Sequence, residues 1–255
     1  MAEAARIHNE ATAEASAQVR AEPPRVPEGV RVYAVGDIHG RADLLGHLHT
    51  RIRIDASDAP ERTKVVVYLG DYVDRGPDSR GVVGALLAEP LPGFRTVALR
   101  GNHEELLLEF LTKPETARIW VMNGGDATLR SYGVNPKDGD CFAVRDRFAA
   151  ALPDAHATFF AGLPLIHTVG DYFFAHAGIR PGVALDRQST DDLLWIREEF
   201  LDSRADFGKV VVHGHTPRRV PDLNFNRIGI DTGAFATGRL TCLVLAGAEQ
   251  RILQT

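Results

Sequence analysis

The feature that most constrains the fold of this chain is a unit that occurs three times in its N-terminal half. Each unit is a short apolar run that ends in glycine and polar residues, and a helical pattern comes after it. The runs and their motifs are residues 32–35 with GDIHG (36–40), residues 65–69 with GDYVDRG (70–76), and residues 96–99 with GNHE (101–104). Buried strands that alternate with helices form parallel sheets, and ligands gather at the carboxyl ends of such strands. The pattern therefore predicts an α/β fold in which the three motifs meet.

The segments after the motifs have the period of helices. Residues 44–52 place four leucine and isoleucine side chains on one helical face. Pro77 and Asp78 can start a second helix, and the apolar residues of 106–111 predict a third.

From residue 113 onward the regular alternation of strands and helices stops. Residues 113–165 contain helix-like pieces and a glycine turn, and we expect them to form a helical insertion that walls the site. Further strands are predicted at residues 172–175, 210–212, 228–230 and 240–245. Because the later ones lie too close together for crossover helices, we expect an antiparallel second sheet that packs on the first as a sandwich.

Composition narrows the possible functions. The chain has 255 residues and a net charge of -5, which does not suit bulk binding of a nucleic-acid backbone. No apolar run approaches the roughly 18–20 residues of a membrane span. Cys141 and Cys242 share no short metal-binding or redox spacing, which favours two structural thiols in a reducing compartment. We expect a cytoplasmic monomer with no nucleic-acid or membrane partner.

Residues 1–29 differ from the rest of the chain. They are rich in alanine, glutamate and then proline, with few large apolar side chains and no continuous apolar segment of a signal peptide. The sequence therefore predicts a disordered tail over 1–29 and a single folded domain over 30–255.

Side chains that bind metals follow five of the strand-like runs. They are Asp37 and His39, then Asp71, then Asn102, then His176, and last His215. Two divalent ions roughly 3.5–4 Å apart need oxygen and imidazole ligands, with one carboxylate shared between them. We expect the first pair to bind one ion, the last three to bind the other, and Asp71 to bridge them. Each residue alone is more often structural, and their shared position after strands carries the interpretation. The lack of cysteine disfavours a structural zinc site and suits manganese first, with iron or zinc as alternatives.

The three motifs resemble the signature blocks of the phosphoprotein phosphatase branch of the calcineurin-like metallophosphoesterases, in their bacterial form. Three later segments also resemble that family: HAG (176–178) and GHT (214–216) match its later metal histidines, and LWIR (194–197) matches the block of its second phosphate-binding arginine. The resemblance covers residues 36–216. It implies a four-layer αββα sandwich with mixed sheets.

The resemblance also implies a mechanism. A water activated by two metals would attack phosphorus in line, and His103 would protonate the leaving alkoxide while Asp74 orients its imidazole. Arg75, Arg197 and Asn102 would bind the phosphate oxygens, and the two arginines can do so with two parallel hydrogen bonds each. His213 is a possible additional histidine near the metals.

The family resemblance favours phosphorylated serine and threonine in a protein or peptide as the substrate. The main alternative is a nucleotide, notably in a symmetrical dinucleoside tetraphosphate hydrolase. An exposed pair of aromatic residues in the insertion could stack an adenine, although packing onto the core is the more common role. The candidates are Trp120, Tyr132, Phe142, Phe159 and Phe160. A non-catalytic scaffold is a remote third alternative, because all the expected site residues are present.

Overall fold

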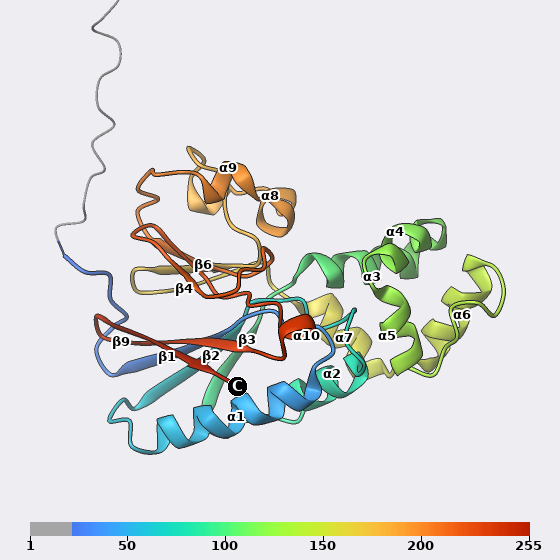
Figure 1. Ribbon diagram of the computed structural model, residues 1–255, viewed down its shortest axis with the longest axis horizontal. Helices are drawn as coiled ribbons and strands as arrows, with labels where there is room; N and C mark the ends of the chain where they lie inside the picture. Colours follow the sequence, from blue (N-terminus) through green and yellow to red (C-terminus); the bar gives the residue numbers. More distant parts are fainter. Residues whose placement is uncertain (1–21) are drawn as a thin grey trace, which may run out of the picture.

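Two five-stranded sheets packed face to face form the centre of the computed structural model, which describes residues 22–255 (Figure 1). The strands are β1 Val30–Val35, β2 Thr63–Tyr68, β3 Phe94–Ala98, β4 Ile166–Val169, β5 Tyr172–Ala175, β6 Val210–His213, β7 Asp222–Leu223, β8 Arg227–Gly229, β9 Thr241–Ala246 and β10 Glu249–Gln254. The helices are α1 Ala42–Ser57, α2 Ser79–Leu87, α3 Asn102–Thr112, α4 Ala117–Met122, α5 Gly125–Ser131, α6 Cys141–Ala151, α7 Asp154–Gly162, α8 Thr190–Trp195, α9 Glu198–Leu201 and α10 Ala234–Thr237, with short 3-10 turns at Pro114–Thr116 and Leu185–Arg187.

The first sheet has the order β10-β9-β1-β2-β3, and its strands β1, β2 and β3 are parallel. Along β1, Val32 packs into the core between the sheets, whereas Tyr33 packs into the core under the helices. Both faces of the strand are therefore buried, which explains why its sequence is continuously apolar. The predicted α/β arrangement and the four αββα layers are confirmed, because α1 and α2 cover one sheet and α8 and α9 the other (Figure 1).

The second sheet has the order β4-β5-β6-β8-β7, and here the predicted antiparallel arrangement is wrong in part. Strands β5, β6 and β8 run parallel, while only the outer strands β4 and β7 are antiparallel to their neighbours. The connection from β5 to β6 holds α8 and α9 and so is long enough for a crossover. The predicted strand at 240–245 is β9, which joins the first sheet.

Residues 22–29, the last part of the predicted tail, pack onto the folded chain. Val26 is buried between the sheets, and its amide donates a hydrogen bond to the carbonyl of Gly247 (3.0 Å). The amide of Arg25 donates to the carboxylate of Asp171 (2.9 Å). The ordered region therefore begins before residue 30, and the remainder of the predicted tail, 1–21, lies outside the described residues.

Residues 113–165, the expected insertion, contain the 3-10 turn Pro114–Thr116 and α4 to α7. Trp120, Phe148 and Phe160 are fully buried in the larger core cluster, together with side chains of α1 and α3. The insertion is therefore an extension of the main core. Among residues 22–255, no helix is long and apolar enough to cross a bilayer.

Candidate active site

The predicted site residues come together at the carboxyl edges of the two sheets. GDIHG follows β1, GDYVDRG follows β2, and GNHE follows β3 and opens α3, while His176 and His215 follow β5 and β6. In parallel strands these ends meet at one edge, so five loops deliver polar side chains to one place.

The backbone of these loops is unusual. Six non-glycine residues in the described part of the chain have a positive φ, and five of them belong to the site: His39, Asp71, Asp74, Arg75 and His215. A left-handed backbone is unfavourable for residues with a Cβ atom, and such conformations cluster where function requires a defined geometry. The strain therefore marks the same loops as the sequence motifs.

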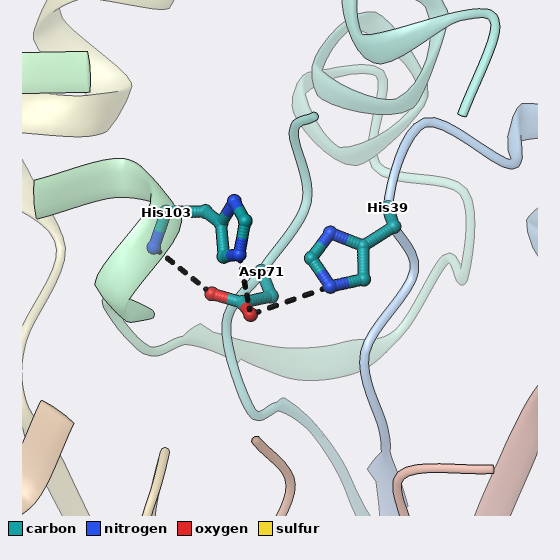
Figure 2. A group of neighbouring side chains, drawn as sticks. All are labelled: His39, Asp71 and His103. Carbon is teal, nitrogen blue, oxygen red and sulfur yellow. Dashed lines mark hydrogen bonds and ion pairs between the residues drawn. The ribbon is translucent and has the colours of Figure 1, made fainter. Parts of the chain in front are cut away.

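One group of metal-binding atoms contains His39, Asp71 and His103 (Figure 2). The Nε2 atoms of His39 and His103 lie 3.4 Å and 3.8 Å from Oδ2 of Asp71. Nδ1 of His39 lies 2.8 Å from the carbonyl of Val73, so the proton sits on Nδ1 and the lone pair of Nε2 faces the carboxylate. This orientation suits a metal ligand.

The other oxygen of Asp71 belongs to a second group. Its Oδ1 lies 3.3 Å from Nε2 of His176, and Oδ1 of Asn102 lies 2.8 Å from the same nitrogen and 2.9 Å from Nδ1 of His215. Nδ1 of His176 donates to the carbonyl of Leu69 (2.9 Å), which leaves the lone pair of Nε2 able to bind a metal ion.

The spacing of these atoms fits a pair of divalent ions. Ligand atoms about 2.0–2.2 Å from one ion stand about 3 Å from each other at right angles, and the distances in the second group are of this size. Asp71 presents one oxygen to each group, which is the arrangement of a bridging carboxylate. Two groups of side chains that could hold ions therefore meet at Asp71, and they bring together His39, Asn102, His176 and His215.

Asp37 is placed differently from the other expected ligands, since it lies outside both groups. Its carboxylate accepts a hydrogen bond from the amide of His215 (3.0 Å) and contacts the carboxyl of Asp231. Burial raises the pKa of Asp37 well above its usual value, and the charges of Asp231 and Asp71 raise it further. Such a concentration of buried carboxyl groups next to imidazoles fits a site that a cation neutralises.

His103 and Asp74, which the sequence predicts as an acid pair, are in contact. Nδ1 of His103 lies 2.6 Å from Oδ2 of Asp74, and both side chains are buried. Burial alone would lower the pKa of His103, but the charges of Asp71 and Asp74 outweigh it, and the pKa is raised. The carboxylate of Asp74 therefore fixes the orientation of the His103 ring.

The two expected phosphate-binding arginines lie on different sides of the site. Nη1 and Nη2 of Arg75 lie 3.0 Å from Nε2 of His39 and of His103, so its guanidinium spans the first group. Nη1 of Arg197 donates to Oγ1 of Thr216 (3.2 Å), and its charge helps to lower the pKa of His215, which burial lowers most. Arg197 therefore lies near the second group.

Several residues with evident roles were not singled out from the sequence. The buried carboxylate of Glu104 accepts hydrogen bonds from the amides of Asp71 (2.8 Å), Tyr72 (2.8 Å) and Gly101 (2.9 Å), and so fixes the second motif against the third. Asp231 follows β8, and the rule that polar residues after strands are functional would have found it. His213 has no part in either metal-binding group, and its ring packs against Phe200.

A model of the calcineurin-like phosphoesterase family matches residues 30–242. Serine/threonine-protein phosphatase 1 of Salmonella typhimurium is 33% identical over 220 residues, covering 82% of this chain and 89% of the relative. The asymmetrical bis(5'-nucleosyl)-tetraphosphatase PrpE of Bacillus thuringiensis is 26% identical over 230 residues, covering 82% and 88%. A crystal structure provisionally described as a diadenosine tetraphosphatase superposes with a TM-score of 0.62 at 24% identity, covering 91% of this chain and 98% of that one. The chain therefore belongs to the calcineurin-like phosphoesterase family, and the match is consistent with its phosphoprotein phosphatase branch.

Proposed function

We propose that this phosphoesterase is a protein phosphatase that hydrolyses phosphoserine and phosphothreonine, with the His103–Asp74 pair as its acid. The observation that carries the proposal is the place of that pair, directly beside the carboxylate that faces two groups of metal ligands. An alkoxide is a poor leaving group, so a site that cleaves serine and threonine esters needs a proton donor at this position.

The residues divide the reaction between them. When bound, two divalent ions lower the pKa of water and so supply a nucleophile near neutral pH. His39, Asp71, Asn102, His176 and His215 would hold them, with Asp37 as the remaining expected ligand of the first ion. Arg75 and Arg197 hold the phosphoryl oxygens, because a planar guanidinium can make two parallel hydrogen bonds to them. His103 donates a proton from Nε2 to the leaving oxygen as the bond to phosphorus breaks, while Asp74 holds Nδ1.

Support for a phosphoprotein substrate comes from the relatives and from the insertion. The relative named a serine/threonine-protein phosphatase is more similar in sequence than the nucleotide hydrolase. Trp120, Tyr132 and Phe160 of the insertion are buried, so they do not offer a free ring to an adenine. Phe159 packs on the core, and Phe142 is exposed.

A nucleotide phosphatase is the second candidate, and one observation favours it. Two partly exposed rings adjoin the metal-binding histidines: Trp195 packs edge-on against His215, and Phe235 packs edge-on against His39. Exposed aromatic rings of this kind can stack bases. The native metals we propose are manganese ions, with iron or zinc as alternatives, in a cytoplasmic monomer.

The choice between the substrates can be tested in one experiment. The purified protein with manganese is assayed on phosphoserine and phosphothreonine peptides and on diadenosine tetraphosphate, with the specificity constant kcat/KM measured for each. We expect the peptides to be the better substrates. Hydrolysis of the dinucleotide alone would overturn the proposal in favour of the second candidate.

Arg197 is expected to bind phosphate. In Arg197→Ala, the KM for a phosphopeptide and the inhibition constant of inorganic phosphate should both rise by about 10- to 100-fold, because hydrogen bonds to charged groups are lost. Arg187→Ala removes an exposed arginine from the same β5–β6 connection and should leave both constants unchanged. An unaltered phosphate inhibition constant in Arg197→Ala would remove this residue from the site.

A further inference from the structure

Residues 120–128, from the end of α4 to the first half of α5, connect the insertion to the second motif of the active site. Nε1 of Trp120 donates to both oxygens of Asp74, at 2.9 Å and 3.1 Å, and Oγ1 of Thr128 donates to Oδ1 at 2.6 Å. Trp120, Asp74 and Thr128 are all fully buried. The carboxylate that orients His103 is thus held on its other side by two buried donors from the insertion.

The same segment also holds the backbone of the second motif. The amide of Asp74 donates to Oγ1 of Thr128 (2.8 Å) and Oγ of Ser79 (3.1 Å), and the amide of Arg75 donates to the carbonyl of Gly124 (3.2 Å). Asp74 and Arg75 both have a left-handed backbone, with φ of 71° and 66°. Consecutive left-handed residues with side chains are costly and persist only when their surroundings fix them.

These contacts have a consequence for proton transfer. A carboxylate with a single hydrogen-bond partner can rotate about its Cβ–Cγ bond, whereas three donors converging on two oxygens fix its plane. The plane of Asp74 in turn sets the direction of the Nδ1–H bond of His103, and therefore where Nε2 points. An imidazole that points away from the leaving oxygen cannot protonate it.

We propose that Trp120 and Thr128 are positioning residues for the general acid, which makes the insertion a working part of the active site. The inference rests on the acid role proposed for His103. In that step the phosphorus–oxygen bond breaks, its electron pair stays on the leaving oxygen, and this oxygen takes the proton from Nε2. His103 is left neutral with its Nδ1 proton still donated to Asp74.

Trp120 also has a packing role, so the test must separate the two functions. Its ring lies 4.9 Å from that of Phe110 and 5.6 Å from that of Phe148. Trp120→Phe keeps an aromatic ring and removes the N–H donor, and Thr128→Val removes a hydroxyl at nearly constant volume. Phe148→Leu is the matched control, because it alters the same cluster without touching Asp74.

The readout is the dependence of turnover on the leaving group. Serine alkoxide needs the proton, whereas p-nitrophenolate leaves readily without it. In Trp120→Phe and Thr128→Val we expect kcat for a phosphoserine peptide to fall about 10- to 100-fold. This is the typical cost of losing a residue that orients a functional side chain by a hydrogen bond. Turnover of p-nitrophenyl phosphate and the metal content should stay near wild type. Thr128→Ser, which keeps the hydroxyl, should restore the peptide activity. The NMR resonance of the Nδ1–H proton of His103 should shift or broaden in both damaging variants.

The outcomes separate this inference from the proposed function. Phe148→Leu should lose stability without changing the ratio of the two activities. If His103→Asn shows no preference for the better leaving group, the acid role itself fails. If His103→Asn shows that preference while Trp120→Phe and Thr128→Val reduce both activities equally or not at all, the positioning role is overturned. Should one variant not fold, the other gives the same test.

Discussion

Replacing Asp71 by asparagine is expected to abolish the binding of both metal ions and with it the phosphatase activity. The two oxygens of Asp71 face different groups, at 3.4 Å from Nε2 of His39 and 3.3 Å from Nε2 of His176. An amide has one oxygen and no charge, so at least one ion loses a ligand and both lose the shared negative charge. Mutating a residue that only hydrogen-bonds to a metal ligand typically lowers metal affinity by about 10- to 100-fold. The loss of a ligand shared by both ions should lower the affinity of both sites by more than that.

The measurement is metal content per chain after dialysis, together with kcat on p-nitrophenyl phosphate. We expect fewer than two ions per chain and a fall in kcat of about a thousandfold or more. Asp78→Asn is a matched control. Asp78 is the N-cap residue of α2, and asparagine caps helices equally well. Two ions retained in Asp71→Asn would contradict the bridging role.

Much of this site could be predicted from the sequence because its residues come directly after buried strands in the chain. A buried strand that ends in glycine and a polar residue fixes both the position of that residue and the edge of the sheet at which it lies. For this reason His39, Asp71 and Asn102, on three consecutive parallel strands, could be assigned to one place. Their side chains lie where the pattern predicts, after β1, β2 and β3.

What the sequence did not reveal depends on contacts between distant segments. Trp120 lies 46 residues from Asp74, and the sequence suggested for it either packing onto the core or stacking on an adenine. Nothing in the composition of a helix shows that one indole N–H will meet a buried carboxylate, because that contact depends on how the insertion docks. The second sheet was misjudged for a related reason. The helices α8 and α9 are only six and four residues long, too short for their periodicity to show a crossover between parallel strands.

His103→Asn is expected to lower kcat on a phosphoserine peptide by about 10²- to 10⁴-fold while leaving two metal ions per chain. The structure makes this test necessary, since Nε2 of His103 lies 3.8 Å from Oδ2 of Asp71 and belongs to the same group as His39. An imidazole with its Nδ1 held by a carboxylate can serve either as a metal ligand or as a proton donor. A metal ligand must be unprotonated at the nitrogen that binds the ion, whereas a proton donor carries its proton there, so metal content separates the two roles.

The two roles predict opposite results for metal content. If His103 is the acid, the asparagine variant keeps its metals and loses activity chiefly on esters with poor leaving groups. If it is a ligand, metal is lost and the activity on all esters falls together. His47→Asn, which changes an exposed histidine of α1, should leave metal content and kcat as in the wild type. Metal content below that of this control would assign His103 to the first ion, and the site would then need another proton donor for serine and threonine esters.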